Sequence, residues 1–300
     1  MILVTGAAGL SGSAVIREFA RRSEPVRALV RSRAKARELE TLPTVEVVEG
    51  DMLQPQTLEA ALAGVERVLM ISSANQQLAE TQYTFIDAAK KVGVRHIVKY
   101  SGLYSTLDSP FLFSRMHAEV ERYLEHSGLA WTHLRPSQFM QVYLREVPTI
   151  VAESAFYLPL EDAKLAPVDI EDIAKATFAL LCTEGHEGKS YDMSGPQALT
   201  MTEVAEQISL AIGKTARYVN ITPEERRQKL LAAGIPPYVV EAVDIQLNER
   251  RKGVESRVYS ETHEALGIHP TTFAEFARRN AAAFRGESGN FGLAWGLARR

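Results

Sequence analysis

The chain begins MILVTGAAGLSG, residues 1–12, an apolar run followed by a turn that contains three glycines. Ile2 to Val4 has the composition of a short buried strand. Gly6, Gly9 and Gly12 come next, and residues 13–22 continue with apolar side chains near the spacing of an amphipathic helix. A strand, a glycine turn and a helix in this order indicate a site for the diphosphate of a dinucleotide.

This interpretation has a physical basis. A tight turn favours residues that tolerate positive φ, and a diphosphate close to the backbone leaves no room for a Cβ. The first turn of a helix also offers N–H donors and a partial positive charge. An ordinary strand-to-helix turn is the alternative, because glycines mark such turns as well. We expect the cofactor to contact Gly6, Ala8, Gly9, Leu10, Ser11 and Gly12.

The composition limits the class of protein. The chain has 300 residues, of which 46% are hydrophobic and 24% charged, as in globular proteins with a core of their own. A net charge of −3 gives no basic footprint for nucleic acid, and we expect no such partner. No apolar run has the length of a membrane span, and no signal peptide precedes the first strand. These observations predict a cytoplasmic protein with no membrane partner.

The single cysteine, Cys182, excludes an intramolecular disulfide and any multi-cysteine metal site. Its apolar neighbours predict a small core residue. The histidines show no metal-ligand spacing, so we expect no metal site.

Strand-like and helix-like segments alternate through the first half of the chain. We expect further strands at 25–30, 45–49, 67–72, 95–101 and 130–135, and helices at 32–40, 57–62, 79–92 and 113–126. Such alternation with short links predicts an α/β fold with a doubly wound parallel sheet, the Rossmann fold. We assign residues 1–150 to this domain, with a core that can extend into 165–195.

The second half is expected to form a smaller, mostly helical C-terminal domain at 151–285. Thr200 with Glu203 and Thr222 with Glu225 have the spacing of capping boxes, and Asp169 precedes a third helix. Residues 286–300 show no clear period and contain several glycines, so we expect a flexible tail or an interface arm.

The end of the second predicted strand indicates the type of nicotinamide cofactor. Sites that prefer NAD carry an acidic residue here, which binds the ribose hydroxyls. This chain has Arg31, Arg33 and Lys35 instead, and no carboxylate before Glu38. Cationic side chains attract a 2′-phosphate, so the sequence favours NADP(H). A solvated basic helix face is the alternative.

Further candidates lie where other strands end. Asp51 could accept a hydrogen bond from the adenine amino group while Met52 packs on the ring, although a local turn role would also account for Asp51. Small residues at the same edge allow the backbone to approach the cofactor. These are Ser72, Ser73 and Ser101.

These segments together resemble the NmrA-like members of the atypical short-chain dehydrogenase/reductase superfamily. The similarity spans most of residues 1–285. It rests on residues 4–12, 29–31, 50–51, 127–129, 134–136, 139–141 and 168–174, and on His117 with Glu121. The pattern is most similar to NADPH-dependent quinone, azo-dye and triphenylmethane-dye reductases. The resemblance implies a substrate cleft between two domains, with Pro136 and Phe139 along the nicotinamide.

One departure concerns the catalytic residues. The wider superfamily uses a Tyr-x-x-x-Lys pair on the helix after the fifth strand, and the segment 113–119 has none. Isoflavone-reductase-like relatives have a Lys at the position of His117, whereas dye reductases have His. The resemblance therefore implies that His117 lies near the nicotinamide ribose or the substrate. Histidine can transfer a proton near neutral pH, or it can only anchor the ribose.

The sequence thus predicts an NADP(H)-dependent oxidoreductase that transfers hydride to a planar electron-poor acceptor, such as a quinone or a dye. A small aromatic or quinone-like molecule is the expected partner, and a homodimer is one option. The alternative is an NADP-binding redox sensor without turnover. An isoflavone-type reductase is disfavoured by the missing Lys. A set of apolar and aromatic residues could line a flat aromatic pocket or could belong to the core. These residues are Phe139, Met140, Tyr143, Phe156, Tyr157 and Leu158.

Overall fold

The computed structural model describes residues 1–287, which divide into two compact units. Unit 1 comprises residues 1–136, 170–193 and 261–268, and unit 2 comprises the remaining segments. These units show which segments pack together, and they do not test where independent domains begin and end. The domain boundaries expected from the sequence therefore stay a prediction. The tail predicted at 286–300 lies, from residue 288 onward, outside the described residues.

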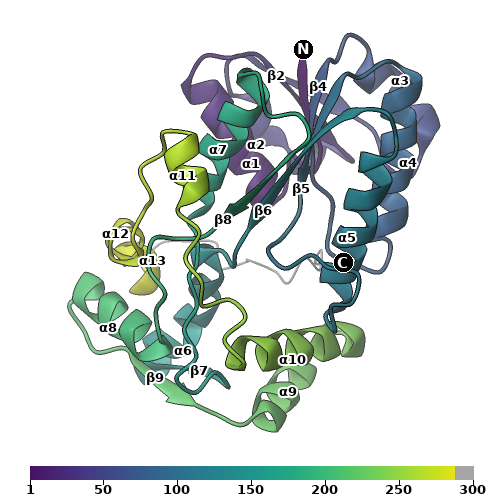
Figure 1. Cartoon of the computed structure of the whole chain (residues 1–300). Helices are drawn as coiled ribbons and strands as arrows, with labels where there is room; N and C mark the ends of the chain where they lie inside the picture. The colour runs from purple at the N-terminus through teal and green to yellow at the C-terminus, as the bar shows by residue number, and fades with distance from the viewer. Residues whose placement is uncertain (288–300) are drawn as a thin grey trace. The chain divides into compact units, whose positions relative to one another are not determined.

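Unit 1 is built on a parallel sheet of seven strands in the order β3-β2-β1-β4-β5-β6-β8 (Figure 1). The predicted doubly wound Rossmann sheet is therefore confirmed. The strands are β1 Ile2–Val4, β2 Val26–Val30, β3 Val45–Glu49, β4 Arg67–Met70, β5 His96–Tyr100, β6 Ala130–Pro136 and β8 Lys189–Met193. Strand β8 was not expected from the sequence; it lies at the edge of the sheet, pairs with β6 and is largely polar.

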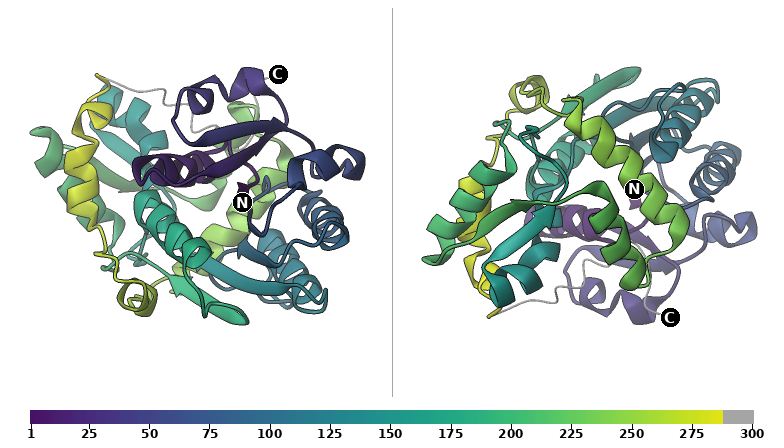
Figure 2. Two further views of the ribbon diagram at one scale, coloured as in Figure 1. Left: turned by 90° about the horizontal axis from the view of Figure 1, so that it is seen from above. Right: turned by 90° about the horizontal axis from the view of Figure 1, so that it is seen from below.

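Helices cover both faces of this sheet, which explains why its central strands consist largely of buried apolar residues. On one face α1 (Leu10–Arg21) packs against α7 (Ile170–Cys182) (Figure 2). The other face carries α3 (Pro55–Leu62), α4 (Leu78–Lys91) and α5 (Leu112–Glu125). Leu3, Val68 and Ile97 pack against the helices of this second face. The short α11 (Glu261–Ala265) contacts β8.

Two local predictions in unit 1 are wrong. The basic helix expected at 32–40 is a 3₁₀ turn, Arg33–Lys35, followed by the short α2, Arg37–Glu40. The Arg33 backbone N–H donates to Glu49 of β3, which holds this segment against the strand. Cys182 is exposed at the end of α7 and is not a core residue, because the apolar spacing of α7 places its two preceding leucines inward.

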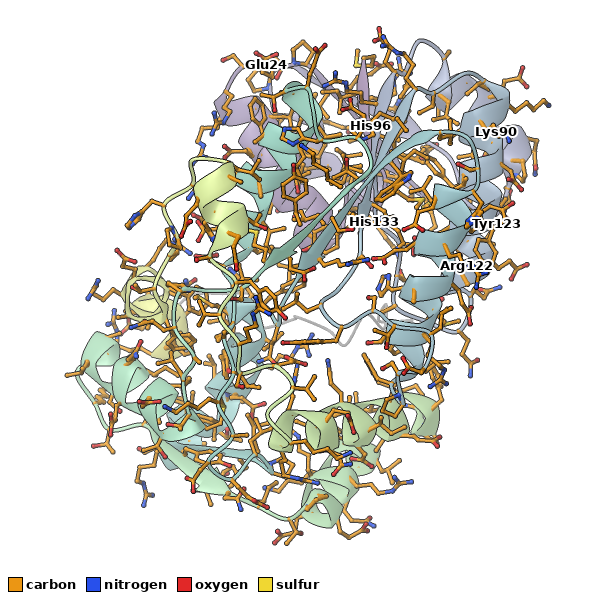
Figure 3. The ribbon with its side chains drawn as sticks, viewed as in Figure 1. Glu24, Lys90, His96, Arg122, Tyr123 and His133 are labelled. Atoms are coloured by element: carbon orange, nitrogen blue, oxygen red, sulfur yellow. The ribbon has the colours of Figure 1, made fainter. Side chains whose placement is uncertain are left out.

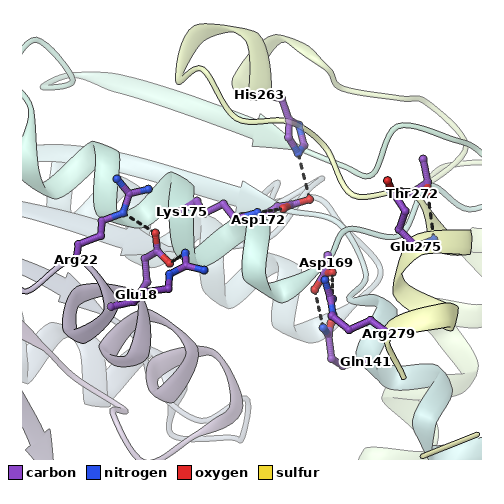
Figure 4. A network of polar contacts seen from close by, with 11 residues as sticks. Glu18, Arg22, Gln141, Asp169, Asp172, Lys175, His263, Thr272, Glu275 and Arg279 are labelled. Carbon is purple, nitrogen blue, oxygen red and sulfur yellow. Dashed lines mark hydrogen bonds and ion pairs between the residues drawn. The ribbon is translucent and has the colours of Figure 1, made fainter. Parts of the chain in front are cut away.

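Unit 2 is mostly helical and contains one small parallel sheet, in which β7 (Ala155–Leu158) pairs with β9 (Arg217–Asn220). Its helices are α6 Val147–Glu153, α8 Met201–Ile212, α9 Pro223–Ala232, α10 Pro237–Arg251, α12 Phe273–Arg279 and α13 Ala281–Phe284, with a 3₁₀ segment at Met140–Glu146. Both predicted capping boxes are present, and α12 begins with a third, Thr272 with Glu275 (Figure 4).

The core of unit 2 packs around large apolar side chains. Met140, Tyr143 and Phe156 are at most 2% exposed and belong to this core, and Leu158 packs against it. Asp169 is fully buried, accepts a hydrogen bond from Gln141 and pairs with Arg279 (Figure 4). Among residues 1–287, no helix combines the length and the apolar character that crossing a bilayer requires.

Candidate dinucleotide site and buried polar cluster

The predicted cofactor residues of unit 1 gather at one edge of its sheet. All seven strands are parallel, so their carboxyl ends share an edge, where open α/β sheets bind ligands. Six of the predicted residues lie at the last residue of strands β1 to β6 or within two residues after it: Gly6, Arg31, Asp51, Ser72, Ser101 and Pro136.

The glycine turn is too tightly packed for a Cβ at Gly12. Gly6 has φ +58°, and the Gly9 N–H donates to its carbonyl at 2.9 Å. A Cβ on Gly12 would lie 2.3 Å from the Gly6 oxygen and 2.8 Å from Cα of Ala7. Both contacts are too short for real atoms, so the sharp turn into α1 requires glycine at position 12. The residues that follow the strand therefore fit a dinucleotide diphosphate.

The N-terminus of α1 supplies donors for that diphosphate. The helix has 12 residues and begins at Leu10, and no side chain caps it. Its first N–H groups have no carbonyl partner within the helix. Gly6, Ala8, Gly9 and Leu10 are exposed, so the turn is open to a ligand. Aligned N–H groups and the helix dipole favour an anion at this position.

Thr5, which the sequence analysis did not select, holds the turn in place. Its hydroxyl donates to the carbonyl of Ile71 at 2.6 Å and accepts the Ile71 N–H at 2.7 Å. Thr5 is fully buried. This side chain joins the end of β1 to the end of β4 and fixes where the glycine turn begins.

The three cations predicted to bind a 2′-phosphate differ in their contacts. Arg31 and Lys35 are exposed, and their side chains have no hydrogen-bond or ion-pair partner among residues 1–287. The Arg33 guanidinium instead pairs with Glu40 at 3.0 Å and donates to the Val47 carbonyl at 2.7 Å. Arg31 follows β2 directly, so it is the best-placed cation for a phosphate.

The remaining edge residues show mixed roles. One Asp51 carboxylate oxygen accepts the Leu53 N–H at 3.0 Å, which is the local turn role considered above. Met52 is 8% exposed and packs in the core. The Ser72 hydroxyl accepts from Gln82 at 2.9 Å, and Ser73 is exposed.

His117 lies within a buried polar cluster, which we call the lysine cluster: Lys99, Ser101, His117, Glu121, His133 and Arg135. Lys99 Nζ is 2.9 Å from His117 Nδ1 and 3.2 Å from the Ser101 hydroxyl oxygen. Lys99 is fully buried and lies in the interior of β5. Lys99 was not expected from the sequence, although a lysine next to Ile97 and Val98 in a predicted strand is an unusual residue that could have been noticed.

Burial controls protonation in the lysine cluster. Desolvation lowers the pKa of Lys99 to about 7, although Glu121 acts in the opposite direction. The pKa of His117 lies well below its ordinary value because of burial and the charge of Lys99. Burial opposes ionisation of Glu121, but the hydrogen bonds from Arg135 and the charge of Lys99 keep its pKa below the ordinary value. His117 is therefore a neutral imidazole near pH 7.

Phe139 belongs to unit 2, where it pairs with Val168 through an isolated β-bridge. The Pro136 carbonyl accepts the Leu103 N–H at 3.1 Å within unit 1. Their predicted positions along a nicotinamide stay predictions.

A doubly wound parallel sheet with this glycine turn defines a Rossmann-type dinucleotide-binding protein. The chain belongs to the NmrA-like family, because the sequence model of that family matches residues 1–277. This confirms the resemblance seen in the sequence.

Several characterised proteins are similar along nearly the whole chain. The NAD(P)H azoreductase of Xenophilus azovorans is 37% identical over 284 residues, which cover 95% of this chain and 99% of that protein. The NADPH complex of the Escherichia coli NADPH-dependent quinone oxidoreductase superimposes with a TM-score of 0.84, at 31% identity and coverages of 93% and 99%. The NADP(H) complex of the Citrobacter sp. triphenylmethane reductase has a TM-score of 0.84, at 26% identity and coverages of 94% and 100%.

Proposed function

We propose that this protein is an NADP(H)-dependent reductase that transfers a hydride to a planar, electron-poor acceptor such as a quinone or an azo dye. The observation that carries the proposal is the glycine turn, where a Cβ on Gly12 would lie 2.3 Å from the Gly6 oxygen beside the uncapped start of α1. The relatives named as NAD(P)H azoreductase and NADPH-dependent quinone oxidoreductase support the reaction class.

In this proposal each edge residue has one task. The turn from Gly6 to Gly12 binds the diphosphate through backbone N–H groups. Arg31, exposed and without a partner among the described residues, binds the 2′-phosphate. The free oxygen of Asp51 binds the adenine amino group while Ser72 and Ser101 leave space for the backbone to approach. Arg33 contributes less, because its guanidinium is already paired with Glu40.

The bound cofactor supplies the hydride, and the protein orients the acceptor and controls its proton. We assign His117 to the reaction centre as a neutral imidazole that donates a hydrogen bond. Its Nδ1 is engaged by Lys99 at 2.9 Å, and its Nε2 has no hydrogen-bond partner among residues 1–287. A neutral donor can bind a ribose hydroxyl or polarise a carbonyl oxygen of the acceptor.

The proposed acceptor is a planar conjugated molecule because the similar proteins are named as an azoreductase and a quinone oxidoreductase. Assembly as a homodimer is a further expectation, which sedimentation of the purified chain would decide.

The direct test is the oxidation of NADPH by the purified protein with a panel of quinones and azo dyes, together with calorimetric titration of NADPH. We expect turnover with at least one class of acceptor and weaker binding of NADH than of NADPH. Tight NADPH binding without turnover on any acceptor would favour the redox-sensor alternative. Failure to bind either nucleotide would contradict both functions.

A further inference from the structure

We propose that Lys99 is a positioning residue for His117, which fixes the proton of the imidazole on Nε2 and replaces that proton after it is transferred to the reduced acceptor. The inference rests on the proposed function, because it deepens the role given there to His117. It assigns a task to a lysine that the glycine-turn and phosphate interpretations do not use.

The geometry brings the two side chains together from different elements. Lys99 lies on β5, and its side chain extends toward α5, where Nζ is 2.9 Å from Nδ1 of His117. The second neighbour of Nζ is the Ser101 hydroxyl at 3.2 Å, and Ser101 in turn lies 3.4 Å from the Ser105 hydroxyl. The lysine is fully buried, whereas His117 is partly exposed. The imidazole therefore links the buried amine to the surface.

The charged groups around Lys99 leave its proton mobile. Glu121 faces it from α5, but both Glu121 oxygens are taken by Arg135 of β6, at 3.0 and 2.6 Å. His133, also on β6, pairs instead with Glu125 at 3.0 Å (Figure 3 places His133 on the sheet). Within residues 1–287, no carboxylate lies in hydrogen-bond contact with Lys99 Nζ. A buried ammonium without an anion loses its proton readily, in agreement with its pKa of about 7.

The hydrogen bond selects one tautomer of His117. An ammonium group has protons to donate and no lone pair. Lys99 in its charged form must therefore donate to a lone pair on Nδ1, and the single proton of a neutral imidazole must lie on Nε2. Once Lys99 is neutral, its amine can either donate or accept, and the tautomer is no longer fixed. Protonated Lys99 thus keeps Nε2 ready to donate.

The proton balance of the reaction follows. Addition of a hydride from the cofactor to the acceptor places two electrons and a negative charge on it. The anion takes the Nε2 proton of His117, Nδ1 takes a proton from Lys99 Nζ, and both groups end neutral. A proton from water then binds Nε2, the Nδ1 proton returns to Lys99, and the pair is restored. The acceptor has gained one hydride and one proton, and the protein is unchanged.

The first test is magnetic resonance of the full-length protein with labelled histidine and lysine. In the wild type below pH 7, the ¹⁵N shifts of His117 should show Nε2 protonated and Nδ1 unprotonated, and Cε of Lys99 should titrate near pH 7. In Lys99→Met, which is apolar and of similar length, the preference for Nε2–H should be lost. Lys90→Met, on the exposed side of α4, is the matched control and should leave the His117 shifts unchanged (Figure 3).

The second test is the pH profile of kcat with a quinone. In the wild type, kcat should fall as pH rises through about 7, where Lys99 loses its proton. Lys99→Met should lower kcat by about 10- to 100-fold and remove this fall, since positioned proton transfer contributes at least about 100-fold in enzymes and water can replace part of it. Lys99→Gln cannot titrate, and its amide can either donate or accept, so it should restore neither the fixed Nε2–H tautomer nor the pH dependence.

The outcomes separate the two proposals. An unchanged His117 tautomer in Lys99→Met, or a wild-type His117 protonated on Nδ1 below pH 7, would overturn the pairing whatever the activity. Titration of wild-type Lys99 near its ordinary value of 10.5 would overturn the proton supply. A wild-type pH profile in Lys99→Met would overturn the proton supply. If the wild type shows no turnover while the resonance test succeeds, the proposed function fails and the pair remains. The wild-type His117 shifts and the wild-type titration of Lys99 need no variant, so they decide the pairing and the proton supply even if Lys99→Met does not fold.

Discussion

Glu121 of α5 and Arg135 of β6 are joined by two parallel hydrogen bonds, Arg135 Nε to Oε1 at 3.0 Å and Nη2 to Oε2 at 2.6 Å. Glu121 is 4% exposed, so the pair lies at the inner side of the helix. Glu121 is the one carboxylate among the six residues that define the lysine cluster, and both of its oxygens accept hydrogen bonds from Arg135. The pair therefore both fastens α5 to the sheet and leaves Lys99 without an anion in contact.

Glu121→Gln should destabilise the protein. Removal of one charge takes away the two-point anion of the partly buried Arg135 guanidinium and leaves the Asp192 carboxylate, at 3.8 Å, as a weaker partner. We expect a cost on the order of 2–3 kcal/mol. Urea unfolding would measure the free energy difference. Glu66→Gln, which removes an exposed pair with Arg95, should cost well under about 1 kcal/mol. The loss of Glu121 should also lower the pKa of Lys99 further, because Glu121 raises it. Equal losses of unfolding free energy in Glu121→Gln and Glu66→Gln would contradict the claim that the Glu121–Arg135 pair fastens α5 to the sheet.

Gly12→Ala should weaken NADPH binding and stability together. Its Cβ would meet the Gly6 oxygen at 2.3 Å, and relief of the clash must move the turn that binds the diphosphate. We expect a loss of about 1–3 kcal/mol in stability and a much weaker affinity for NADPH in calorimetry.

Gly93→Ala is the control for that loss of stability. Gly93 has φ +84°, and no atom lies within 4 Å of the position that a Cβ would take there. The substitution therefore costs about 1 kcal/mol of backbone strain far from the turn. NADPH affinity should stay unchanged in this variant. Equal NADPH affinity in Gly12→Ala and the wild type would remove the glycine turn from the cofactor site.

Arg31→Ala should reduce the preference for NADPH over NADH. A hydrogen bond to a charged group contributes about 1.5–3 kcal/mol, which corresponds to roughly a 10- to 100-fold loss of NADPH affinity with little change for NADH. Arg122→Ala on the outer side of α5 is the matched control and should change neither affinity (Figure 3). The same ratio in Arg31→Ala and the wild type would exclude Arg31 from the 2′-phosphate site.

Stability should depend on pH through Lys99. Its pKa is lowered from 10.5 to about 7 in the folded state, so between these values the unfolded chain binds more protons than the folded one. The wild type should therefore gain stability relative to Lys99→Met as pH rises from 7 to 10.5, by up to about 5 kcal/mol. Below pH 7 the penalty for burying the charge is complete, and Lys99→Met should be the more stable protein. A stability difference independent of pH would contradict the lowered pKa.

The sequence predicted the parts of the fold that depend on local pattern. Strands β1 to β6 are short segments rich in apolar residues, and α1 follows glycines that the structure shows to be tightly packed. It did not predict β8, because a polar edge strand lacks an apolar run. The helix expected at 32–40 is broken by contacts of Arg33 with β3, which join residues 14 and 16 positions apart.

In the candidate site, too, the residues that follow from local sequence pattern could be predicted and those that depend on long-range packing could not. The glycines and Arg31 could be chosen because strand ends mark the edge of a parallel sheet. Lys99 could not be paired with His117 from sequence, because they lie 18 residues apart and meet only through the packing of α5 on β5. Likewise, only the structure shows that Arg33 is engaged while Arg31 is exposed.

The most direct measurement of the central claim is a single-turnover reaction of the protein–NADPH complex with a quinone, followed by the loss of absorbance of the reduced nicotinamide. We expect that one quinone is reduced for each NADPH oxidised, and that NADPH deuterated at the transferred position reacts more slowly. NADPH that stays bound and unoxidised in the presence of both quinones and azo dyes would contradict the account.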